Sequence, residues 1–203
     1  MTPENHAGFD RRQVLRGLAA GATASALWIS ELAAFAEEQA LHTHVALSAA
    51  GQAPAAFVPK VLIGPHLETV AVLAEHIIPT TDTPGARTAE VDRFVDYTLD
   101  AATPAVRSRF LQGLEWLDAR SQALFGATFS RATLAEQRDL LTRLSADDAP
   151  AREGEVGAQF FTAIKTMTIT GYYSTEIGLR QELGDPGELM LARFDGCTHA
   201  EHQ

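Results

Sequence analysis

Apolar residues recur at helical spacing along most of this 203-residue chain, and no useful stretch alternates between apolar and polar residues with a period of two. This spacing puts the apolar side chains of a segment on one side of a helix, which must then be buried against other helices. The sequence therefore predicts an all-α fold, a compact single-domain helical bundle or array. We expect helices over residues 67–78, 88–101, 104–125 and 133–144, and around residues 160–167.

Turn and cap signals separate these helices. Pro79 withholds an amide hydrogen and restricts the residue before it, so the first helix is expected to end there. Pro84 and Gly85 suit the two central positions of a type II turn. Two further helices are expected to begin at a cap formed by the pairs Thr103–Pro104 and Thr133–Glu136.

The amino-terminal segment has the layout of a twin-arginine export signal. Arg11 and Arg12 are followed by Leu15 and then by a small, moderately apolar stretch over residues 17–29. Ala34 and Ala36 are small residues at the two positions required before a cleavage point, so we place the cut between Ala36 and Glu37. The alternative is an ordinary amphipathic helix with solvated arginines.

Three segments follow from this interpretation: a signal over residues 1–36, a connector over residues 37–65, and a helical domain over residues 66–203. The connector is predicted because residues 37–65 are rich in Ala, Gly, Pro and Ser and show no sustained period. From Gly184 onward the chain is expected to form an irregular tail.

The charge balance limits the possible partners. The formal net charge is −10, with 16 Lys and Arg against 26 Asp and Glu. Nucleic acid binding needs clustered cations, so neither nucleic acid nor an anionic membrane surface is an expected partner.

No common cofactor motif occurs in the sequence. It has no glycine-rich dinucleotide fingerprint, no phosphate loop, no nucleophile elbow and no haem attachment motif. Glu75, Asp92 and Asp96 are interpreted as a solvated helix face, and His76 as a partly buried histidine with a satisfied hydrogen bond. We therefore expect no catalytic residue and no cofactor in this chain.

The tail gathers ligand-competent side chains within Asp195–His202. A metal site is one interpretation, although the spacing matches no closed zinc site. Cys197 is the only cysteine, so it cannot form a disulfide within the chain. The second interpretation is therefore an interchain disulfide or another partner contact through Cys197 and His199. The third is a tail with no special role.

Three aromatic residues are candidates for a partner surface. Trp116 lies about 120° around its helix from the apolar stripe, at ~100° per residue, where it could anchor a partner or pack against a helix of its own chain. Tyr172 and Tyr173 are adjacent and point in different directions, which allows one ring in the core and one at the surface. The alternative is that both rings pack in the core.

Several phrases closely resemble the gluconate 2-dehydrogenase subunit 3 family. They are His76–Ala86, Val91–Asp96, Phe160–Phe161, Gly171–Gly178 and Gly196–His199, which follow one another in the expected order between residues 67 and 200. The resemblance implies a non-catalytic small subunit bound to a large FAD-dependent oxidoreductase of the glucose-methanol-choline type in the periplasm. Family members accompany gluconate 2-dehydrogenases or glucoside 3-dehydrogenases.

The same resemblance implies further partners: a separate cytochrome c with its haem as electron acceptor, and the twin-arginine translocase, through which the small subunit escorts the flavoprotein. The matched positions Pro79, Asp82, Pro84 and Gly85 are interpreted as a rigid turn that could be presented to the large subunit. The alternative is that the turn only redirects the chain. Two rival functions are a free-standing periplasmic helical binding protein and a metal-dependent enzyme that uses the Cys197 and His199 tail.

Overall fold

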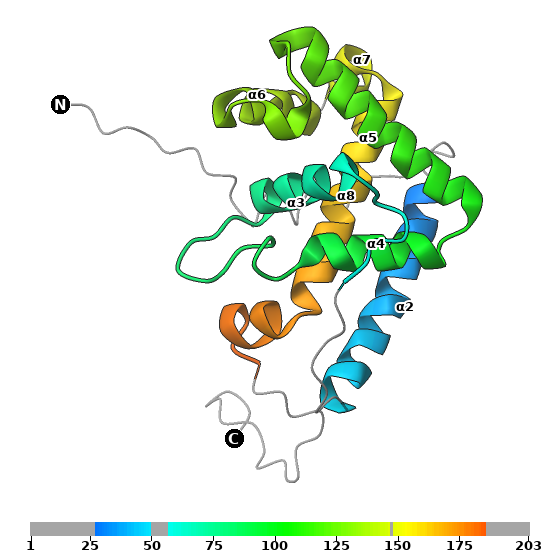
Figure 1. Cartoon of the computed structure of the whole chain (residues 1–203), viewed down its shortest axis with the longest axis vertical. Helices are drawn as coiled ribbons and strands as arrows, with labels where there is room; N and C mark the ends of the chain where they lie inside the picture. Colours follow the sequence, from blue (N-terminus) through cyan, green and yellow to red (C-terminus); the bar gives the residue numbers. More distant parts are fainter. Residues whose placement is uncertain (1–26, 50–56, 147, 186–203) are drawn as a thin grey trace, which may run out of the picture.

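The computed structural model describes residues 27–49, 57–146 and 148–185, and within these ranges every regular element is helical. This confirms the all-α prediction. Figure 1 shows the helices packed as a single array. The α-helices are α2 (Leu27–Ala49), α3 (Pro65–Ile77), α4 (Val91–Ala101), α5 (Pro104–Phe125), α6 (Leu134–Ser145), α7 (Ala149–Glu153) and α8 (Glu155–Tyr173), with short 3-10 and π-helical turns at η3 (Phe129–Arg131) and η4 (Ile177–Glu182).

Helix α8 forms the centre of the array and packs against every other α-helix described. Its buried residues include Phe160, Phe161, Ala163, Ile164, Met167 and Tyr172. The sequence of residues 168–173 is rich in β-branched and aromatic residues, yet the helix continues through them. Burial on several sides outweighs their weak helix propensity.

Two glycines bring α5 and α8 close together. A Cβ on Gly113 of α5 would lie 2.4 Å from the ring of Phe160, and a Cβ on Gly157 of α8 would lie 2.3 Å from the indole of Trp116. Each helix thus has a glycine at the point where an aromatic ring of the other helix packs against it. Half-buried Trp116 therefore packs against α8 of its own chain, which is the second interpretation of this residue.

Helix α2 corrects the predicted connector, because residues 37–49 are helical. On its amino-terminal half, Trp28, Leu32 and Ala36 are buried in the common core. The alanine-rich composition of residues 37–49 favours a helix rather than a loop, because alanine has the highest helix propensity of all residues. The loop signals Gly51 and Pro54 come only after the helix has ended.

The segment before α3 is held against α4 by a buried carboxylate. Asp96 is 1% exposed and accepts hydrogen bonds from the main-chain N–H groups of Lys60 (2.9 Å), Val61 (2.9 Å) and Leu62 (2.7 Å). The interpretation of Asp96 as a solvated residue was therefore wrong. Its position is explained by geometry, since it lies about 60° around the helix from buried Leu99 at ~100° per residue.

Candidate partner interface

The connection between α3 and α4 stands out from the helical body, at the left of Figure 1. We call residues Ile78–Ala86 the proline turn. It begins where Pro79 ends α3, after the Ile78 N–H has donated to the Ala74 carbonyl (2.9 Å). Residues 79–82 are exposed, Thr83 and Pro84 are half-buried, and Gly85 and Ala86 are buried. The turn thus has an exposed tip and a buried base.

The carboxylate of Glu75 organises the base of the proline turn. Thr80 donates both its main-chain N–H (2.8 Å) and its hydroxyl (2.9 Å) to Glu75 Oε1, and the Arg87 N–H donates to Oε2 (3.0 Å). The Thr80 hydroxyl oxygen in turn accepts from the Gly85 N–H (3.0 Å). The Glu75 side chain therefore fixes the backbone on both sides of the tip, and the three bonds that it accepts are strengthened because the acceptor is a carboxylate.

The predicted type II turn at Pro84 and Gly85 was wrong. That turn requires a positive φ at its second central residue, and Gly85 is not among the glycines with positive φ. Glycine is needed here for space instead. A Cβ at this position would lie 2.5 Å from the Thr80 nitrogen and 2.6 Å from a Glu75 carboxylate oxygen.

Two distant elements brace the other side of the turn. The Tyr172 hydroxyl on α8 donates to the Pro84 carbonyl (2.8 Å), while the Thr83 hydroxyl donates to Glu182 Oε2 on η4. Tyr172 is fully buried, and its ring meets the ring of half-buried Tyr173 edge to face at 5.2 Å between centroids. A loop held from α3, α8 and η4 loses little conformational entropy when a partner binds it.

The exposed tip offers groups for recognition. The prolyl ring of Pro79, the hydroxyls of Thr80 and Thr81 and the carboxylate of Asp82 lie in the exposed stretch. The Thr81 hydroxyl donates to Asp82 Oδ1 (2.8 Å), which orients both side chains. Across the residues that the structure describes, no three His, Cys, Asp or Glu side chains gather as a metal site would require.

His76 and Asp92 flank the turn and have ordinary structural surroundings. His76 Nε2 lies 2.8 Å from Gln137 Oε1, and its ring meets Phe129 edge to face at 6.2 Å. It is thus a partly buried histidine with a hydrogen-bond partner. Asp92 is half-buried at the start of α4, and desolvation by this burial raises the pKa of its carboxyl above the ordinary value.

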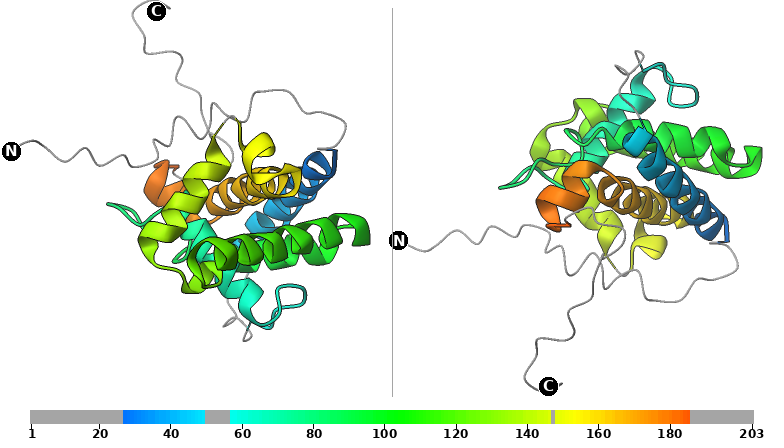
Figure 2. Two further views of the ribbon diagram at one scale, coloured as in Figure 1. Left: turned by 90° about the horizontal axis from the view of Figure 1, so that it is seen from above. Right: turned by 90° about the horizontal axis from the view of Figure 1, so that it is seen from below.

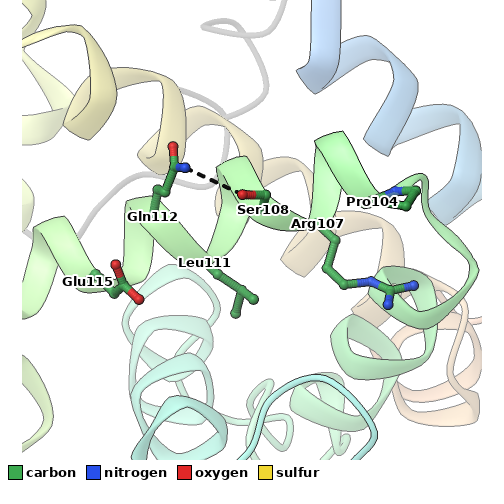
Figure 3. Close-up of a pocket in the computed structure, with 6 residues that line it drawn as sticks. All are labelled: Pro104, Arg107, Ser108, Leu111, Gln112 and Glu115. Carbon is green, nitrogen blue, oxygen red and sulfur yellow. Dashed lines mark hydrogen bonds between the residues drawn. The ribbon is translucent and has the colours of Figure 1, made fainter.

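A shallow depression of about 390 Å³ lies on α5 (Figure 3). All its lining residues come from this one helix: Pro104, Arg107, Ser108, Leu111, Gln112 and Glu115. Arg107, its only cation, donates from Nε to the Leu99 carbonyl (2.9 Å) and from Nη2 to the Asp100 carbonyl (2.7 Å). The arginine therefore caps the end of α4, and the depression is a feature of one helix surface.

The structure brings together only part of the predicted interface. Pro79, Asp82, Pro84 and Gly85 form one turn, and Tyr172 joins them from below through Pro84. The export residues Arg11, Arg12 and Leu15 lie outside the described residues, as do Cys197 and His199 in the tail. The roles given to these five residues stay predictions. Ala34, Ala36 and Glu37, at the predicted cleavage point, lie within α2.

Sequence reasoning missed Glu75 and Glu182 as parts of this region. The prediction that Glu75 lies on a solvated face was wrong. Glu75 lies one helical turn before Pro79, where the free N–H groups of a sharp turn need an acceptor. A glutamate at this spacing before a proline could therefore have predicted the hydrogen bonds to the turn. Glu182 gives none, because its contact with Thr83 spans 99 positions.

The fold and the braced turn define a small, all-helical domain that presents a preformed loop at its surface. A family model described as gluconate 2-dehydrogenase subunit 3 matches residues 65–185, which run from the start of α3 past the end of η4. The chain belongs to this family and is an accessory subunit of that type. The family name implies association with other gluconate 2-dehydrogenase subunits.

Comparison with curated proteins and comparison with solved structures each gave no match. Within the described part of the chain, no helix has both the length and the apolar character needed to cross a membrane.

Proposed function

We propose that this chain is the small, non-catalytic subunit of an FAD-dependent oxidoreductase that acts on CH–OH groups of a sugar, sugar acid or glycoside. The large subunit, of the glucose-methanol-choline type, holds the FAD and the substrate. A cytochrome c with its haem accepts the electrons. The single observation that carries this proposal is a braced, exposed turn inside the region that matches the family.

The proline turn supports a binding role because its geometry does not depend on the partner. Three elements fix its backbone, so binding energy is not spent on ordering the loop. The exposed carboxylate of Asp82 and the neighbouring hydroxyls can form charge-assisted and neutral hydrogen bonds with donors on the flavoprotein. A subunit that binds only the folded flavoprotein also stabilises it by mass action.

Export is the second part of the proposed role. Arg11, Arg12 and Leu15 have the twin-arginine layout, and this route carries proteins that are already folded. A small subunit with such a signal can escort a bound flavoprotein through the twin-arginine translocase to the periplasm. There the complex can remain free or be held at the inner membrane.

The test is purification of the tagged full chain from the native periplasm, with flavin absorbance and partner masses recorded. We expect a larger FAD protein to co-elute, and we expect both proteins to leave the periplasm when Arg11 and Arg12 are changed to Lys. A colourless, monodisperse single chain would contradict the proposal and favour a free-standing binding protein.

A matched pair of variants tests the turn itself. Asp82→Arg changes an exposed carboxylate of the turn, whereas Asp139→Arg makes the same charge change on the surface of α6. We expect at least a tenfold loss of co-eluting flavin for Asp82→Arg and little loss for Asp139→Arg. Equal retention in both variants would exclude the turn from the interface.

A further inference from the structure

The predicted cleavage point lies in the middle of a continuous helix. Helix α2 runs from Leu27 to Ala49, so Ala34, Ala36 and Glu37 are all followed and preceded by helical residues. The side chain of Ala36, immediately before the predicted cut, is fully buried. A signal peptide that is removed at this point would not be expected to have either property.

The half of α2 before the cut is part of the protein core. Trp28 is 4% exposed and Leu32 is 1% exposed, and with Ala36 they form a stripe at intervals of four residues. Ile29 and Phe35 pack against the same cluster from its edge. Figure 2 shows α2 lying beside α8 in both views, and α2 also contacts α4 and α5.

A polar contact fixes the register of this packing. Trp28 Nε1 donates a hydrogen bond to Gln159 Oε1 on α8 (2.9 Å), across 131 positions of sequence. The opposite side of α2 carries exposed Ser30, Glu31, Glu37 and Glu38. Over residues 27–40 the helix therefore has one face in the core and an exposed face that carries polar and acidic side chains.

Cleavage of a packed helix requires local unfolding. A protease binds its substrate as an extended strand, so a peptide bond inside a helix is cut only from a locally opened state. Opening α2 around Ala36 would also remove Trp28 and Leu32 from the core. A chain exported in the folded state would reach the signal peptidase with this bond already protected.

We propose that α2 is a permanent structural helix of the subunit, so the folded chain is not cut between Ala36 and Glu37 and the mature protein keeps Leu27–Ala49. Any removal of the leader occurs before Leu27. The packing of α2 does not depend on the proposed function. The protection of the Ala36–Glu37 peptide bond during export does rest on the proposed function, because that function includes export of the folded chain.

The first test is the intact mass and the amino-terminal sequence of the chain purified from the periplasm. We expect the first residue to be Leu27 or an earlier one. A chain beginning at Glu37 would overturn the proposal. This readout is separate from flavin co-elution, so either result can occur with or without a bound flavoprotein.

The second test uses full-length variants and applies even to a chain that is never exported. Leu32→Ala removes a buried side chain of α2, whereas Leu27→Ala removes one that is 61% exposed on the same helix. We expect Leu32→Ala to lower the Tm and to increase the rate of proteolysis within residues 30–40 at least tenfold. We expect Leu27→Ala to match the unaltered chain. Equal behaviour of both variants would show that α2 is not docked.

Discussion

Asp96 is stabilised by the main chain. Three successive N–H groups point at its carboxylate, and hydrogen bonds to a charged acceptor contribute about 1.5–3 kcal/mol each when measured singly. In Asp96→Asn one acceptor oxygen is replaced by an NH₂ group that faces these donors. We predict a loss of about 2–4 kcal/mol in the free energy of unfolding, measured by urea denaturation.

Asp100 provides the control for that experiment. It lies one helical turn further along α4 and pairs with Lys60 at the surface, where both side chains are more than one third exposed. Exposed ion pairs contribute about 0–1 kcal/mol. Asp100→Asn should therefore change stability by less than 1 kcal/mol, and a loss equal to that of Asp96→Asn would refute the special role of the buried carboxylate.

Gly157 of α8 allows close packing against α5 because it has no side chain. In Gly157→Ala the new methyl group would meet the indole of Trp116, and overpacking of this kind costs about 1–3 kcal/mol. We predict that loss for the single variant. Combination with Trp116→Leu should relieve the clash, so circular dichroism in urea should give a double-variant loss smaller than the sum of the two single losses. Additive losses would show that the two residues do not interact.

At the scale of elements, the start of α6 depends on a capping box. The Thr133 N–H and hydroxyl both donate to Glu136 Oε2 (2.8 Å each), and the Glu136 N–H donates to the Thr133 hydroxyl oxygen (3.4 Å). The bonds from Thr133 lower the pKa of the Glu136 carboxyl below its ordinary value of 4.5. The carboxylate therefore stabilises the fold above pH 4.5, and this contribution is lost as the pH falls through the lower, folded-state pKa.

We predict that Thr133→Ala lowers the Tm by about 2–4 °C at pH 7, because the cap is lost. The difference from the unaltered chain should shrink in acid, below the folded-state pKa of Glu136. Scanning calorimetry from pH 7 to pH 3 would measure both effects. A Tm difference that stays constant over this range would show that the ionised carboxylate does not support the cap.

The elements that could be predicted are those with local signals. Pro104, Thr133 and Glu136 marked helix starts correctly, since caps depend on neighbours within four residues. The second expected helix begins at Val91 rather than at residue 88, because Glu90 adopts a left-handed φ of 55° just before it. Helix α7 formed where only a break was expected, with Pro150 in its first turn.

The candidate site was predictable only in outline. The prolines of the turn predicted a rigid loop. Much of its rigidity, however, comes from hydrogen bonds to distant residues of the same chain, which sequence spacing does not reveal. Tyr172 reaches Pro84 across 88 positions, and Glu182 reaches Thr83 across 99. Such contacts depend on how α8 and η4 pack beside the turn, so they could be found only from the structure.

At the scale of the whole molecule, the core extends beyond the region that matches the family. The match begins at Pro65, yet α2 lies before it and packs along the central helix α8. Residues from α2 and from the matched helices form one buried cluster, which includes Leu32, Val95, Phe110 and Met167. Small domains are only marginally stable, so a helix that adds an aromatic and a leucine to the core should be part of one cooperative unit.

The two tryptophans of the chain allow that cooperativity to be tested. Trp116→Phe leaves Trp28 as the reporter of α2, and Trp28→Phe leaves Trp116 as the reporter of α5. We predict that in each variant the fluorescence and far-ultraviolet circular dichroism transitions in urea share one midpoint, because two-state unfolding gives coincident probes. Lower stability of the Trp28→Phe variant is also expected, since its hydrogen bond to Gln159 is lost. If the Trp28 signal changed at a lower urea concentration than the dichroism, α2 would unfold before the rest of the array, and its buried stripe would be an appendage to the core rather than part of it.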